Sequence, residues 1–236
     1  MAKLALIENP LTAQRAILSG DALVHLADHA VVSVSGEDRL SWLHSLLSQN
    51  IKNLQPGQST QALLLDPQGH IEQILSILDD GETTWIIVAK STADTLLAWL
   101  GKMVFRMKVL VSDRTADFEV VGSWGKAIEG SAFSWIDGWL QTAPGGHRYG
   151  ESPTEPWNLQ LNAISVAYFP ELVTSAKWAS TDALDALRIA AHRPGIAEVD
   201  EKSLPHELDL LASAVHLSKG CYRGQETVAK VHNLGH

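Results

Sequence analysis

The chain has 236 residues, of which 45% are apolar and 19% charged, and its formal net charge at pH 7 is −9. This length and composition predict two domains or subdomains with enough apolar side chains for real cores. The acidic balance argues against nucleic-acid binding through a general positive field, and no apolar run is long enough to predict a membrane span.

The N-terminal segment MAKLALIENPLTAQ is not a secretory signal peptide, because Glu8, Asn9 and Pro10 interrupt its short apolar run. The single cysteine of the chain cannot form an internal disulfide. Together these two features predict a reducing, cytoplasmic environment.

Strand and helix patterns alternate along the first half of the chain. Residues 23–34 are predicted to form a strand or hairpin, and Ser35 to cap a helix whose leucines recur at helical spacing. A second helix is predicted from residue 91. Further strands are predicted over residues 61–66, 71–78, 83–89, 104–111 and 117–124. In the 104–111 strand, Arg106 and Lys108 would form a solvated basic face, with a site for an anionic tail as the alternative.

The second half of the chain begins with a segment rich in glycine and proline, residues 141–157, which predicts a long loop. A strand region follows over residues 159–169. The run STDALDALRIAAHRPG predicts a helix that starts at Ser180 or Thr181 and stops at Pro194. This mixture of hairpins and helices predicts the α+β class.

The motif KGCYRGQE, residues 219–226, holds the only cysteine, Cys221, between two glycines and two cations. Glycines at this spacing predict a turn or a close backbone approach rather than a packed element. Lys219 and Arg223 would favour the thiolate if they lie near the sulfur. The motif alone leaves two interpretations open, a functional thiol and a buried packing cysteine.

No metal site is predicted from the sequence. The ten histidines are scattered without zinc spacing, and one cysteine cannot by itself hold an iron–sulfur cluster, which usually takes four thiolates. The eight tryptophans are interpreted as packing residues, which is the usual role of an indole in a core.

The longer run KGCYRGQETVAK resembles the motif K-G-C-[aromatic]-x-G-Q-E-x-x-x-[R/K] of the YgfZ family, and it matches at every position. Asn50, in the segment VSGEDRLSWLHSLLSQNIKNLQPG, takes the place of a family asparagine. Two further segments are similar to the family, LLLDPQGHI and ALRIAAHRPGIAEVDEKSLPHELDL. The likeness covers most of residues 23–236.

This resemblance implies an α+β fold like that of the T-protein of the glycine cleavage system, in which a ring of subdomains surrounds a folate groove. It predicts a discontinuous first subdomain of residues 1–35 and 112–200, a second subdomain of residues 36–111, and a Cys-motif segment of residues 201–236. The C-terminal β-barrel that normally follows the motif is expected to be truncated or absent.

The resemblance also implies a function. It predicts a folate-binding protein that supports assembly or repair of iron–sulfur clusters, including those of tRNA-modifying enzymes, through a reactive cysteine. The expected partners are a tetrahydrofolate derivative and iron–sulfur client enzymes, without direct contact to nucleic acid or membrane. The predicted catalytic residues are Cys221 and Lys219, and the predicted folate contacts are Asn50, Tyr222, Gln225 and Glu226.

The alternative function is that of the T-protein itself, a folate-dependent aminomethyltransferase; a binding module with an incidental thiol is a third hypothesis. The T-protein has acidic residues where this chain has Gln73 and Ile74, and a carboxylate where this chain has Ala190. Because proton transfer needs a positioned base, these replacements count against a classical aminomethyltransferase.

Overall fold

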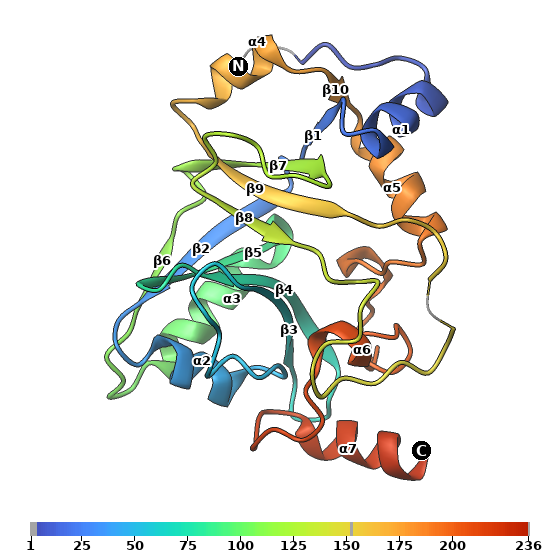
Figure 1. Ribbon diagram of the computed structural model, residues 1–236. Helices are drawn as coiled ribbons and strands as arrows, with labels where there is room; N and C mark the ends of the chain where they lie inside the picture. Colours follow the sequence, from blue (N-terminus) through green and yellow to red (C-terminus); the bar gives the residue numbers. More distant parts are fainter. Residues whose placement is uncertain (1–3, 152, 236) are drawn as a thin grey trace.

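The computed structural model describes residues 4–151 and 153–235 (Figure 1). Within this part of the chain, two five-stranded sheets pack face to face and form the centre of the molecule. The first sheet has the strand order β10-β1-β7-β9-β8, and the second has the order β3-β4-β5-β2-β6.

The first sheet contains β1 (Leu23–His25), β7 (Phe118–Trp124), β8 (Phe133–Ile136), β9 (Leu159–Ser165) and β10 (Trp178–Ala179). The second contains β2 (His29–Ser35), β3 (Ser59–Leu65), β4 (Ile71–Asp79), β5 (Thr83–Ala89) and β6 (Leu110–Asp113). The helices are α1 (Pro10–Leu18), α2 (Arg39–Leu46), α3 (Lys90–Met103), α4 (Phe169–Ser175), α5 (Thr181–Ala190), α6 (Leu211–Ala214) and α7 (Gln225–Leu234), with a 3-10 turn at Ile196–Glu198.

The second sheet is buried on both faces. Leu63 and Ile87 face the first sheet and share a core with Leu161 of β9. Leu64 and Ile86 are the adjacent positions of the same strands, and they belong to the core that α2 and α3 cover. Because successive side chains of a strand point to opposite faces, this double burial explains why the second halves of β3 (ALLL) and β5 (IIVA) are continuous apolar runs.

The structure confirms the α+β class and the three predicted strands at 61–66, 71–78 and 83–89, which are β3, β4 and β5. The prediction of a strand over 104–111 is wrong for most of that range. Helix α3 continues to Met103, and Phe105 has a φ of 44°, which an extended strand cannot accommodate. Only residues from Leu110 onward pair with β2.

The predicted subdomain boundary at residue 35 stays a prediction, and the strand pairing favours an earlier one. Strand β2 pairs with β5 and β6 of the second sheet, whereas β1 pairs with β7 and β10 of the first. The chain therefore passes from one sheet to the other between His25 and His29. Residue patterns define a strand but not the sheet that it joins, which is why the sequence did not reveal this crossing. We propose a division that assigns residues 29–113 to the second sheet.

Within residues 4–151 and 153–235, no helix has both the length and the apolar character needed to cross a bilayer.

Candidate functional site

A cavity of about 260 Å³ lies between the two sheets, with α5 on one side. Its apolar walls include the indoles of Trp135 and Trp157 and the side chain of Leu184. Polar groups at its border come from His29 of β2, Ser76 of β4 and Asp185 of α5. A small volume with indole walls suits a flat heteroaromatic ring better than an aliphatic chain.

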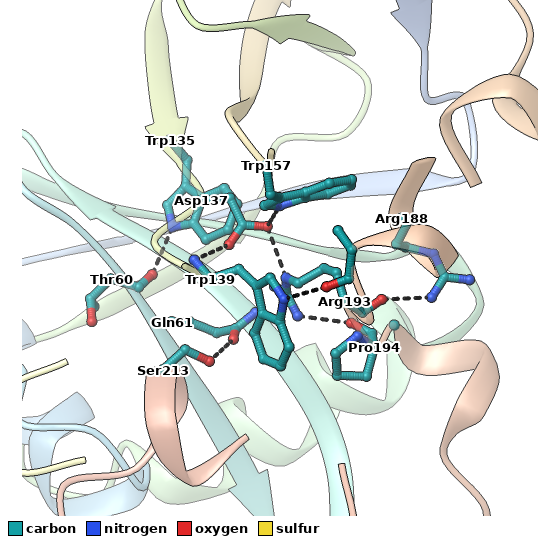
Figure 2. Close-up of polar contacts among 12 residues, drawn as sticks. Thr60, Gln61, Trp135, Asp137, Trp139, Trp157, Arg188, Arg193, Pro194 and Ser213 are labelled. Carbon is teal, nitrogen blue, oxygen red and sulfur yellow. Dashed lines mark hydrogen bonds and ion pairs between the residues drawn. The ribbon is translucent and has the colours of Figure 1, made fainter. Parts of the chain in front are cut away.

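An ion pair between Asp137 and Arg193 forms part of the cavity wall (Figure 2). Arg193 Nε donates to Asp137 Oδ2 at 2.9 Å, and the two side chains are only 7% and 4% exposed. The indole N–H of Trp157 donates to the same oxygen at 2.8 Å, and the backbone N–H of Trp139 donates to Oδ1 at 3.1 Å. These donors compensate the buried carboxylate, so the pair can hold the loop after β8 against the loop after α5.

Arg188 orders the chain at the border of the cavity. Its guanidinium donates to Asp185 Oδ1 at 2.9 Å, to both oxygens of Glu198 at 2.9 Å and to the carbonyl of Arg193 at 2.8 Å. Burial would raise the pKa of Glu198, but the hydrogen bonds from Arg188 and from the Gly195 N–H outweigh it and keep that pKa below its usual value. The border therefore carries fixed charges of both signs.

Two carboxylates at this cavity were missed by the sequence reasoning. The chain has Ala190 where the T-protein has a carboxylate, but Asp137 and Asp185 line the cavity from other positions. A carboxylate accepts hydrogen bonds from the amino groups that a pterin ring presents. The Asp185 acceptor and the indole walls thus fit the ring of a folate, with the rest of such a ligand outside this volume. The local signal was the spacing of Asp185 and Arg188, one helical turn apart.

The predicted cysteine lies elsewhere, in the turn that precedes α7. Cys221 is exposed, so the interpretation as a buried packing cysteine is wrong. Gly224 has a φ of 79°, and a Cβ there would lie 2.6 Å from the carbonyl oxygen of Asp66 and 2.9 Å from Gly69 Cα. The turn is thus packed directly on the β3–β4 hairpin.

The other glycine of the motif, Gly220, has no such role. A Cβ there would have no neighbour within 4 Å and φ is not positive, so the backbone does not require glycine at this position.

Lys219 is buried and ties this turn to the end of α2. Its ammonium donates to the carbonyl oxygens of His44, Leu47 and Gln49, the last two at 2.5 and 3.2 Å, and lies 5.0 Å from the ring centroid of Tyr222. A cation at the C-terminal end of a helix satisfies carbonyls that lack helical partners. Burial lowers the pKa of Lys219 to about 8. The structure therefore gives Lys219 a positioning contact, and a catalytic role stays a prediction.

The second cation of the motif is also occupied. Arg223 donates to both oxygens of Glu72, at 2.7 and 3.2 Å, and its guanidinium lies 5.6 Å from the ring centroid of Trp99. With Lys219 bound to carbonyls and Arg223 to a carboxylate, the expected stabilisation of a Cys221 thiolate by these two charges is not supported.

The predicted folate contacts lie around the same turn. Tyr222 is buried, Gln225 Nε2 donates to the carbonyl of Lys219 at 3.2 Å, and Glu226 is exposed in the first turn of α7. Asn50 is exposed beside Gln49, one of the Lys219 acceptors. None of these four residues lines the cavity between the sheets. The structure brings them near Cys221 instead, and their contact with folate stays a prediction.

Raising the pH from about 8 to 10.5 should increase the free energy of unfolding through Lys219. In this window the unfolded chain binds a proton that the folded chain has lost, so the gain should be about 1–3 kcal/mol. Urea denaturation at both ends of the window, in the wild type and in Lys219→Met, measures it. If the stability of the two proteins depended equally on pH, the gain could not be assigned to Lys219.

The amino-acid sequence of this chain is similar to those of several curated proteins. No protein-family model matches the chain. It is 29% identical to the iron-sulfur cluster assembly factor IBA57 homolog, mitochondrial, of Mycosarcoma maydis, over 90% of this chain and 54% of the relative. It is 25% and 26% identical to the tRNA-modifying proteins YgfZ of Vibrio atlanticus and Yersinia enterocolitica, over 90% and 96% of this chain and 66% and 72% of the relatives. The resemblance to the YgfZ family is confirmed.

The fold of this YgfZ-like chain is that of the T-protein. The crystal structure of the glycine cleavage system aminomethyltransferase T from Bartonella henselae superposes with a TM-score of 0.74, over 98% of this chain and 69% of that one. Sequence identity is 14%, so this likeness concerns the fold alone. The YgfZ-like chain spans 54% and 66% of the length of the first two relatives.

Proposed function

We propose that this chain is a folate-binding, YgfZ-like factor that supports assembly or repair of iron–sulfur clusters, including those of tRNA-modifying enzymes, with Cys221 as its reacting group. The observation that carries the proposal is the exposed thiol of Cys221 on a turn that Gly224 fixes against the β3–β4 hairpin. The names of its YgfZ and IBA57 relatives support the same interpretation. A cytoplasmic location and iron–sulfur client enzymes as partners belong to this proposal.

The folate ring would bind in the cavity between the sheets. Trp135 and Trp157 offer apolar faces to it, and the exposed carboxylate of Asp185 offers an acceptor for its amino groups. A bound tetrahydrofolate would supply a carrier for one-carbon units. The cavity of about 260 Å³ is slightly below the range of about 300–1,000 Å³ of ligand pockets, which supports a ring inside and a tail outside.

The exposed Cys221 thiol would serve the cluster chemistry. As a thiolate it can attack a disulfide or hold a sulfur species for transfer. It cannot hold a cluster alone, since clusters usually need four thiolates, so any cluster contact would be shared with a client. This division of work explains why the thiol has to be exposed.

An aminomethyltransferase activity is not favoured. Gln73, which replaces an acid of the T-protein, is 2% exposed and directs its amide to the carbonyl of Thr92 at 3.3 Å. A buried amide cannot act as a general base, and its neighbour Ile74 cannot either. If the purified protein transferred a one-carbon unit from a folate donor to glycine, the aminomethyltransferase would become the favoured function.

The test is complementation of a bacterial strain that lacks its own YgfZ-like protein. We expect the wild type to restore thiolated tRNA, and Cys221→Ala and Cys221→Ser to restore about a tenth of that level or less, a loss typical of a removed nucleophile. Ser218→Ala, at a position close by in the chain, is the matched control, and immunoblots check protein level. Full restoration by Cys221→Ser would refute the role of the thiol.

The folate part is tested separately by thermal shift with 5-formyltetrahydrofolate up to millimolar concentration. A rise in melting temperature is expected in the wild type, and Ser76→Tyr, which would fill the cavity, should abolish it. Absence of any shift in the wild type would remove folate from the proposal and leave the thiol untouched.

A further inference from the structure

The loop after α3 exposes an aromatic side chain without a packing reason. Phe105 is 83% exposed, and its φ of 44° lies in the left-handed region, which is costly for a bulky residue. The ring buries almost nothing within the chain, so no internal contact compensates the strained backbone. Strain of this kind, kept at an exposed aromatic residue, is typical of functional positions.

A hollow of about 680 Å³ lies beside this residue, and we call it the Phe105 groove. It is lined by Trp42, Ser45, Leu46, Met103, Phe105, Arg106 and Met107. The indole N–H of Trp42 donates to the carbonyl of Met103 at 2.9 Å and fixes the end of α3 against α2. The groove is therefore shaped by two helices as well as by the loop after α3.

The methionine content of the Phe105 groove is unusual for this chain. The sequence has three methionines in total, at positions 1, 103 and 107, so both internal ones line this groove. Methionine side chains are flexible and polarizable, and they are over-used at surfaces that bind varied apolar partners. The lining thus favours an apolar protein segment as the occupant.

Arg106 gives the groove a positive charge although the chain as a whole is acidic. Arg106 and Lys102, which precedes the groove residue Met103 in the chain, are exposed, and within residues 4–151 and 153–235 no carboxylate lies within ion-pair distance of either. Lys108 differs, because it pairs with Glu37. Two uncompensated cations in a chain of net charge −9 attract an acidic partner locally.

We propose that the Phe105 groove docks a segment of a partner protein that combines large apolar side chains with acidic residues. The apolar side chains would enter between Trp42, Met103 and Met107, with Phe105 packing on them and Arg106 pairing with an acid. A net charge of −9 disfavours approach to an anionic bilayer and to a second copy of this chain. This surface is independent of the cavity between the sheets and of Cys221.

The test uses a phage-displayed library of random 12-residue peptides, selected on the wild-type protein after depletion on Phe105→Ser. The best binders are then synthesised and titrated by fluorescence anisotropy. We expect the selected peptides to carry acidic residues next to Leu, Phe, Met or Trp. Phe105→Ser and Arg106→Glu should each weaken binding at least tenfold, and Lys126→Glu, at another exposed cation, should leave it unchanged.

Folding of the variants is checked by their melting temperatures. Phe105→Ser should melt no lower than the wild type, because the ring is exposed, and Phe105→Gly should melt at the same temperature or higher, because glycine adopts the required φ freely. The proposal fails if no acidic, apolar peptide binds, or if binding survives both groove substitutions. It also fails if the wild type floats with phosphatidylglycerol vesicles, or sediments as a dimer, and Phe105→Ser abolishes that behaviour. Such a result would assign the groove to a membrane or to a second copy of the chain.

Discussion

Replacing Asp137 by asparagine should lower the free energy of unfolding by about 3–5 kcal/mol, the usual cost of leaving a buried charge without its partner. Arg193 is 7% exposed, and its Nε donates only to Asp137 Oδ2. The substitution removes the negative charge but keeps the shape of the side chain. Urea denaturation at pH 7, followed by tryptophan fluorescence, measures the loss.

Two controls separate this effect from a general loss of charge. Asp185→Asn removes an exposed partner of Arg188, which keeps Glu198, so it should change stability by about 0.5 kcal/mol or less. The double substitution Asp137→Leu with Arg193→Met removes the unpaired charge and should recover part of the loss. Recovery should not be complete, because the N–H groups of Trp139 and Trp157 lose their acceptor. If Asp137→Asn behaves like Asp185→Asn, the ion pair does not hold the two loops together.

Replacing Gly224 by alanine should destabilise the protein by about 2–4 kcal/mol, the sum of a left-handed backbone at a residue with a Cβ and of overpacking. The new Cβ would lie 2.6 Å from the carbonyl oxygen of Asp66, which belongs to the hairpin backbone and cannot turn aside. We expect the turn that holds Cys221 to separate from the hairpin. Differential scanning calorimetry and the protease sensitivity of α7 measure the two effects.

The same motif supplies a matched control. Gly220→Ala introduces the same methyl group four residues earlier, where nothing lies within 4 Å and φ is not positive. Its effect should be within about 0.5 kcal/mol, as for most surface substitutions. Equal losses from Gly220→Ala and Gly224→Ala would mean that the close approach to Asp66 is not what makes the second glycine necessary.

Local features of the fold could be predicted well from the sequence. Strands β3, β4 and β5 are joined by short turns with glycine and aspartate, so their existence, order and antiparallel pairing follow from neighbouring residues. The glycines around Cys221 also predict a turn rather than a packed element, and Cys221 lies exposed in the turn that precedes α7. In both cases the information lies within about ten residues of the feature.

Features that depend on distant segments could not be predicted. Asp137 and Arg193 have ordinary surroundings in the sequence, and only the packed sheets bring them together. Lys219 and Arg223 were interpreted through their neighbour Cys221, whereas their partners are the end of α2 and Glu72 of β4. The alternating pattern around Phe105 predicts a strand, and no local signal in the sequence indicates its positive φ.

The crossing of the chain between β1 and β2 has a consequence for the order in which the protein forms during synthesis. All strands of the second sheet lie between His29 and Asp113, so this sheet can be completed before most of the chain that follows it is synthesised. Strand β1 precedes it in the sequence but needs Trp178 of β10 as one neighbour and Gly122 of β7 as the other. Strand β1 is therefore synthesised before the second sheet but paired on both sides only after β10 has been made, and until then its valine and leucine can be exposed to a chaperone.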